Sequence, residues 1–159
     1  MTRRRRMQIA CVMMLSLEGV LAAPKTTVVF VCEHGAAKSV IAAAYFNKLA
    51  AERHLNFHAI ARGTKPQADI SRAVTKGLRA DGVAFEKERP RLLTDADAAG
   101  AVRIVAFCPV SKAYARTVRV DEHEDVPEVN DNYSAACDVI IQYVRQFLDQ
   151  LQTETQGRP

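Results

Sequence analysis

The chain lacks the cysteine patterns that build disulfide scaffolds and zinc modules. It has four cysteines among 159 residues, at positions 11, 32, 108 and 137, without a CxxC pair or a zinc-like spacing. It also lacks internal repeats and low-complexity tracts, which excludes repeat arrays. With 48% hydrophobic and 25% charged residues, the chain is expected to fold as one globular domain that keeps a free thiol.

Excess positive charge is nearly absent from the body of the chain. The formal net charge is +4, but the first 22 residues hold four arginines and one glutamate, which leaves +1 for the remainder. Nucleic acid is therefore not an expected partner.

The N-terminal segment is typical of a secretory signal peptide. Four arginines precede the apolar run 7–17, and small residues follow, so a cut after residue 22 or 23 is expected. The run of 11 residues is too short to span a bilayer, so no stable membrane insertion is expected after its removal. This predicts a periplasmic or secreted protein. The alternative is a cytoplasmic protein in which residues 1–23 are a disordered extension.

The rest of the chain alternates strand and helix patterns. Strands are expected at 27–32, 56–61, 102–108 and 117–121, and helices at 38–53, 70–82, a short segment from 94, and 134–151. This order predicts a three-layer α/β/α fold with a four-stranded parallel sheet over residues 24–153, and a disordered tail at 154–159. Such sheets bind ligands at the carboxyl ends of their strands.

The segment from Val28 to Ser39 carries the most chemical information. Four apolar residues form a strand pattern buried on both faces, which runs into Cys32, a glycine-bearing loop and Lys38. Backbone N–H groups in such a turn can converge on an anion, and the following helix N-terminus adds partial positive charge. The same field favours the thiolate of Cys32, so the segment predicts an anion cradle around a nucleophile.

With strand, cysteine, loop and helix in this order, the chain resembles the low-molecular-weight protein tyrosine phosphatase family, which also contains thioredoxin-coupled arsenate reductases. Residues 32–39 resemble the family's phosphate loop, 61–64 the segment after its second strand, 73–85 the helix and turn that follow, and 125–129 its late acidic segment. The resemblance covers most of residues 26–151 and implies a phosphotyrosine protein phosphatase I-like fold.

The resemblance also implies a hydrolase of phosphotyrosine or small aryl phosphates that forms a cysteinyl-phosphate intermediate. Cys32 is the implied nucleophile, Ser39 steadies its thiolate, and Glu128 is the implied general acid, with Asp125 in reserve. The implied phosphate-binding residues are Glu33, His34, Gly35, Ala36, Ala37, Lys38 and Ser39. No metal and no organic cofactor is implied, and the expected partner is a phosphorylated protein or a small oxyanion.

Two residues depart from the family pattern at the chemical centre. Lys38 stands where the family has an arginine, and Glu128 followed by Val129 replaces an Asp-Pro acid. An arginine fork holds two phosphoryl oxygens, whereas a lysine offers a point charge on a flexible stem. Glu128 can still protonate a leaving group, but its side chain is one methylene longer.

Two other functions stay open. Cys108 ends the third expected strand near the site, so it is either the redox partner of Cys32 in an arsenate reductase that uses a thiol reductant, or an accidental buried cysteine. Residues 109–116 contain no second resolving thiol. The other function is a catalytically weakened oxyanion-binding module.

Three further features have both a site role and a structural role open to them. Arg62 is expected either to bind anions beside Lys38 or to face water, and Tyr133 either to line the substrate cleft or to cap the last helix. The acidic run 121–125 is expected to be a solvated loop rather than a metal site.

Overall fold

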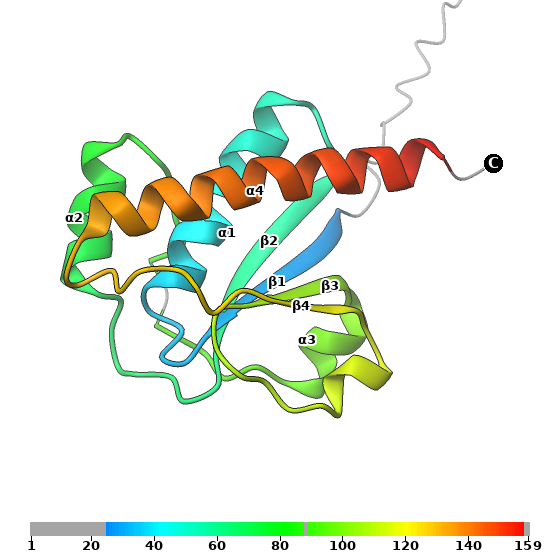
Figure 1. Ribbon diagram of the computed structural model, residues 1–159, viewed down its shortest axis with the longest axis horizontal. Helices are drawn as coiled ribbons and strands as arrows, with labels where there is room; N and C mark the ends of the chain where they lie inside the picture. Colours follow the sequence, from blue (N-terminus) through cyan, green and yellow to red (C-terminus); the bar gives the residue numbers. More distant parts are fainter. Residues whose placement is uncertain (1–24, 88, 158–159) are drawn as a thin grey trace, which may run out of the picture.

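The structure is a computed structural model that describes residues 25–87 and 89–157 (Figure 1). The signal peptide or extension predicted at residues 1–23 lies outside the described residues. Among the residues that are described, no helix is long and apolar enough to cross a membrane.

The expected parallel sheet is confirmed. Strands β1 (Thr26–Cys32), β2 (Phe57–Gly63), β3 (Ala101–Ala106) and β4 (Val120–Glu122) lie in the order β2-β1-β3-β4, and every neighbouring pair is parallel. Strand β1 is central because its four apolar residues, 28–31, are fully buried and fill both faces.

Helices cover both faces of this sheet, as the α/β/α prediction requires. On one face α1 (Lys38–Glu52), α2 (Arg72–Ala80) and α4 (Tyr133–Gln156) enclose the larger core, where Phe30 meets Phe46 and Phe147 at ring-centroid distances of 5.6 and 6.3 Å. On the other face α3 (Asp95–Gly100) covers Val29 and Val31. Figure 1 shows α1 and α4 on one side of the sheet and α3 on the other.

Helix boundaries follow local signals in the sequence. Thr94 caps α3 through a capping box with Asp97, as predicted, because its side chain accepts the N–H of the third helical residue. Ser71 is the N-cap residue of α2 without a side-chain capping bond, since its hydroxyl donates to Asn130 instead. Gly82, at a φ of 64°, follows the end of α2.

The largest errors among the boundaries predicted from the sequence are the start of the fourth strand and the end of the last helix. The fourth strand spans Val120–Glu122 and not 117–121, because Tyr114–Arg116 form a 3-10 turn (η1) and the carbonyl of Tyr114 accepts the N–H groups of both Thr117 and Val118. The last helix continues to Gln156, so residues 154–156 are helical and do not belong to a disordered tail. Nothing between 134 and 156 is a glycine or a proline, and Gly157 follows the helix.

The topology places a binding site at the end of β1. The chain moves from β1 to β2 on one side and later to β3 on the other, so the two crossovers diverge at the carboxyl end of β1. Such switch points leave a crevice between the diverging loops. Cys32 is the last residue of β1 and therefore lies in this position.

Candidate functional site

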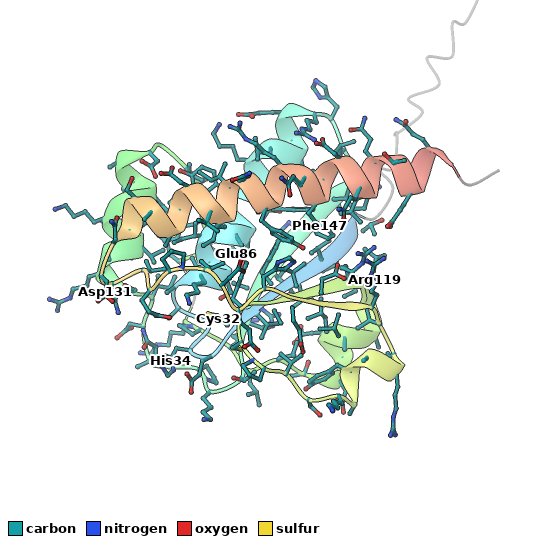
Figure 2. The ribbon with its side chains drawn as sticks, in the orientation of Figure 1. Cys32, His34, Glu86, Arg119, Asp131 and Phe147 are labelled. Atoms are coloured by element: carbon teal, nitrogen blue, oxygen red, sulfur yellow. The ribbon has the colours of Figure 1, made fainter. Side chains whose placement is uncertain are left out.

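The thiol of Cys32 is held where β1 meets α1. Its Sγ lies 3.0 Å from Oγ of Ser39, which is fully buried in the first turn of α1. The N-terminus of α1 carries the positive end of the helix dipole, and the hydroxyl of Ser39 can donate to a thiolate. Figure 2 shows Cys32 near the middle of the molecule, with His34 further out on the loop.

The loop after Cys32 turns its carbonyl groups away from the thiol. The carbonyls of Cys32, Glu33, His34 and Ala36 accept the N–H groups of Thr64, Lys65, Gln67 and Ser71 at 2.7–3.2 Å. In contrast, the N–H groups of residues 33–39 find no acceptor within the described part of the chain. A run of such N–H groups at a helix N-terminus forms a concavity that favours an anion.

Gly35 lets this loop approach β2 closely. Its φ is 61°, and a Cβ on Gly35 would lie 2.8 Å from the backbone nitrogen of Gly63. Gly63 ends β2, and a Cβ there would lie equally close, at 2.8 Å, to the nitrogen of Gly35. The loop shape therefore depends on two facing glycines.

Lys38 and Glu128 meet at the edge of the cradle. The Nζ of Lys38 donates to Oε1 of Glu128 at 2.7 Å, although the two residues are 90 positions apart. The Lys38 side chain is 11% exposed and that of Glu128 is 72% exposed, so the acid reaches inward from the surface to a buried cation. Asp125, the reserve acid, is exposed and has no place in the cleft described next.

A cleft of about 160 Å³ opens above the cradle. It is lined by Cys32, Glu33, His34, Ala37, Lys38, Phe107, Cys108 and Glu128. The sequence interpretation missed Phe107 as a wall of this cleft. The position of Phe107 after β3 could have indicated this role, because the carboxyl ends of neighbouring parallel strands meet at one edge of the sheet.

Cys108 shares the cleft with Cys32. Its Sγ lies 4.0 Å from Oγ1 of Thr64, and burial raises the pKa of the Cys108 thiol above its ordinary value, although the hydrogen bond with Thr64 acts in the opposite direction. This thiol therefore resists ionisation.

Glu33 and His34 face outward from the cradle. Glu33 pairs with Lys65 at 3.3 Å, and Nδ1 of His34 lies 3.3 Å from the carbonyl of Lys65. Both side chains are more than half exposed, at 52% and 57%. The carboxylate of Glu33 is thus partly neutralised, which lessens its repulsion of an anion in the loop.

Arg62 has a structural partner on the other side of the sheet. Its Nε and a terminal nitrogen donate to the two oxygens of Asp97 at 3.0 and 2.9 Å. Burial opposes ionisation of Asp97, but the hydrogen bonds from Arg62 and Thr94 outweigh it and hold the pKa of Asp97 below its ordinary value. Arg62 therefore joins β2 to α3 and does not accompany Lys38.

Tyr133 also lies outside the cleft. Its ring packs on Gly77 of α2, where a Cβ would overlap with the ring, and its hydroxyl donates to Asp81 at 2.9 Å. Tyr45 donates to the same carboxylate oxygen at 2.8 Å, and burial together with Asp81 raises the pKa of both phenols. The remaining free thiol, Cys137, donates to the Tyr133 hydroxyl, so this cluster ties α1 and α2 to α4.

The acidic run 121–125 is partly engaged by arginines. Asp121 accepts Arg103 at 2.7 Å and Arg119 at 3.0 Å. In the described residues, no three His, Cys, Asp or Glu side chains are grouped so that they could hold a metal ion.

Comparisons with known proteins agree with this geometry. Residues 27–157 match the family model described as low molecular weight phosphotyrosine protein phosphatase. No curated protein matches the sequence. Among similar solved structures, YfkJ from Bacillus subtilis has a TM-score of 0.72 and 21% identity, covering 84% of this chain and 98% of its own.

Two more of the similar structures are an arsenate reductase and a tyrosine phosphatase. The thioredoxin-dependent arsenate reductase Cg_ArsC1' from Corynebacterium glutamicum has a TM-score of 0.68 and 23% identity, covering 86% of this chain and 67% of its own. A low molecular weight protein tyrosine phosphatase from T. tengcongensis has a TM-score of 0.68 and 15% identity, covering 79% and 99%. At these identities the likeness shows the fold.

Proposed function

The chain belongs to the low molecular weight phosphotyrosine protein phosphatase family, and we propose that it hydrolyses phosphotyrosine or small aryl phosphates through a cysteinyl-phosphate on Cys32. One observation carries this proposal. The loop after Cys32 offers N–H groups without acceptors in the described chain, next to a thiol whose neighbours are Ser39 and a helix N-terminus. Such a cradle fits the three equatorial oxygens of a transferring phosphoryl group.

In the first step the thiolate of Cys32 attacks phosphorus. A sulfur–phosphorus bond forms, the bond from phosphorus to the leaving oxygen breaks, and Glu128 gives that oxygen its proton. The N–H groups of residues 33–39 and the ammonium of Lys38 hold the charge on the remaining oxygens. In the second step water attacks phosphorus, Glu128 accepts the proton of the water, and Cys32 leaves as a thiolate.

The pair of Lys38 and Glu128 links binding to chemistry. The Nζ of Lys38 donates to Oε1 of Glu128 at 2.7 Å, so the two groups the mechanism needs are in direct contact. An anion in the cradle competes with Glu128 for Lys38, which frees the Glu128 side chain to turn toward the leaving oxygen. Replacement of the family arginine by Lys38 predicts a slower enzyme, because a point charge organises fewer oxygens than a guanidinium fork.

The test is hydrolysis of an aryl phosphate by the full chain, with and without vanadate. Cys32→Ser should abolish a vanadate-sensitive activity, whereas Cys137→Ser should keep it, because Cys137 lies between helices away from the cleft. Absence of activity in pure protein would refute the proposal. Binding of phosphate without any covalent phosphocysteine would favour the oxyanion-binding module instead.

A second candidate, arsenate reduction, is favoured by one observation, the shared cleft of Cys32 and Cys108. Cys32 would displace water from arsenate and form a sulfur–arsenic bond. The thiol of Cys108 would then attack the sulfur of Cys32, the sulfur–arsenic bond would break with its electron pair going to arsenic, and arsenite would leave. An external dithiol would reduce the resulting disulfide between Cys32 and Cys108. This function requires Cys108 and a thiol donor. Unchanged arsenate turnover in Cys108→Ser would rule this route out.

A further inference from the structure

Five exposed cations lie on helix α2 and on the segment that follows it. Arg72, Lys76 and Arg79 are exposed at helical spacing along α2, and Lys87 and Arg89 are exposed just beyond it. Within the described ranges none of these five cations makes an ion pair or a hydrogen bond through its side chain. We refer to these five residues as the basic face.

Most described carboxylates near the basic face are engaged elsewhere. Asp81 accepts the hydroxyls of two tyrosines, and Glu86 faces His58 at 3.8 Å. For Asp69 and for Asp131, the latter just before α4 in Figure 2, no ion pair is found among the described residues, and Glu88 lies outside them. Positive charge therefore predominates here, although the chain after residue 22 carries a net charge of only +1.

The basic face includes a cleft with an apolar floor. This cleft of about 220 Å³ lies between α2 and the following segment, and its lining combines cations, apolar side chains and one acid: Arg79, Lys87, Arg89, Ile70, Phe85, Thr75 and Asp69. Three cations around two apolar side chains suit an extended segment with acidic and apolar residues. A flat or uniformly basic surface would suit a membrane or a nucleic acid better.

The basic face begins next to the loop that forms the anion cradle. The N–H of Ser71, the residue before α2, donates to the carbonyl of Ala36 in the loop at 3.0 Å. Arg72 then occupies the first position of α2, where the helix dipole disfavours a cation and where acids are commonly found. A chain held at Cys32 can therefore continue over α2.

We propose that the basic face binds the acidic residues that flank the phosphorylated residue of a protein substrate. This inference rests on the proposed function, because it assumes that the phosphorylated residue occupies the cradle at Cys32. The cations attract and orient the flanking acids, and Ile70 with Phe85 accepts an apolar side chain between them. The site would thus select acidic phosphopeptides over neutral or basic ones.

The test compares phosphotyrosyl peptides of equal length with acidic, neutral or lysine-containing flanks on either side. The ratio of kcat/KM for each peptide to that for a small aryl phosphate isolates the contribution of the flank. We expect an acidic peptide to be preferred by about tenfold at low salt, and the preference to shrink as salt is added. Equal ratios for the three peptides would overturn the proposal.

Two matched triple variants test whether the preference for acidic peptides depends on the cations of α2. The triple variant Arg72→Gln, Lys76→Gln, Arg79→Gln should lose most of the acidic preference and keep helix propensity. The control triple variant Lys25→Gln, Arg116→Gln, Arg145→Gln changes the charge equally at exposed positions outside the basic face and should keep the preference. Loss of the preference in both triple variants would show a general charge effect and refute a docking surface.

A binding measurement tests the preference for acidic peptides without relying on turnover. Fluorescence anisotropy of the same labelled peptides with Cys32→Ser protein should rank them in the same order. If no aryl phosphate is hydrolysed, the proposed function fails while this ranking still supports or overturns the basic face. Tighter binding of anionic phospholipid vesicles or single-stranded DNA than of the acidic peptide would overturn it.

Discussion

Gly35 and Gly82 share one backbone conformation but have different surroundings, so they form a matched pair. Their φ angles are 61° and 64°. A Cβ on Gly82 meets nothing within 4 Å, whereas a Cβ on Gly35 lies 2.8 Å from the nitrogen and 3.1 Å from the Cα of Gly63. The atoms it meets belong to the backbone of a central sheet, which cannot move aside cheaply.

The difference in surroundings sets the size of the expected effect. Either Gly→Ala change places a Cβ in the left-handed region, at a cost of about 1–2 kcal/mol, less roughly 0.5 kcal/mol gained by restricting the unfolded chain. Gly82→Ala should therefore lower the free energy of unfolding by about 1 kcal/mol. Gly35→Ala adds an overpacking cost of about 1–3 kcal/mol, for a total near 3 kcal/mol.

Urea unfolding of the two variants and the unchanged chain measures this difference. Aryl phosphate hydrolysis should also fall sharply in Gly35→Ala, because relief of the contact displaces the cradle, and should persist in Gly82→Ala. Equal losses of stability within about 0.5 kcal/mol would refute the claim that the loop is pressed against β2. Full hydrolysis by a folded Gly35→Ala protein would refute the claim that the loop shape holds the substrate.

Three other predictions follow from contacts at and around the cleft. Lys38→Arg should raise kcat on an aryl phosphate, and no gain with arginine would mean that the site has been adapted to another ligand. Lys38→Met should lower kcat/KM by roughly 10- to 100-fold, because a charge-assisted hydrogen bond to the substrate is lost. Glu128→Gln should tighten inhibition by phosphate, because it frees Lys38 from its partner at 2.7 Å. The same change should slow turnover at least tenfold, and faster turnover would exclude Glu128 as the general acid. Asp97→Asn should lower the free energy of unfolding by about 2 kcal/mol near neutral pH, because the pKa of Asp97 is depressed in the folded protein. This loss should vanish as the pH falls through the depressed pKa. A loss that does not depend on pH would contradict the prediction.

The last prediction of this group concerns Cys108, whose pKa is raised by burial. Its alkylation by iodoacetamide, followed by peptide mapping in Cys32→Ser protein, should be slow at neutral pH and should still accelerate at a pH where a free thiol has reached its full rate. Rapid alkylation at neutral pH would contradict the raised pKa of Cys108 and would favour the redox role.

Local patterns in the sequence were enough to predict most of the fold. The uninterrupted apolar residues of β1 identify a strand buried on both faces, and Thr94 identifies the start of α3, because each signal depends on adjacent residues. The fourth strand was misplaced for the same reason. Thr117 and Val118 have strand-like side chains, but hydrogen bonds to Tyr114 hold them in a turn.

Contacts between residues far apart in the sequence could not be predicted from such local patterns. Spacing alone cannot reveal that Gly35 faces Gly63, that Arg62 pairs with Asp97, or that loop carbonyls are held by residues 64–71. The basic face was missed because a net charge near zero conceals charges that are separated in space. The position of Cys32, in contrast, followed from the sequence, because a strand end before a helix is defined locally.

The covalent state of Cys32 during turnover tests the central claim most directly. The full chain is mixed with an aryl phosphate, denatured within the first turnover and examined by intact-mass and peptide mass spectrometry. The account predicts one added phosphoryl group on the peptide that contains Cys32, and none in Cys32→Ser protein. Hydrolysis that proceeds without this adduct, or that persists in Cys32→Ser, would contradict it.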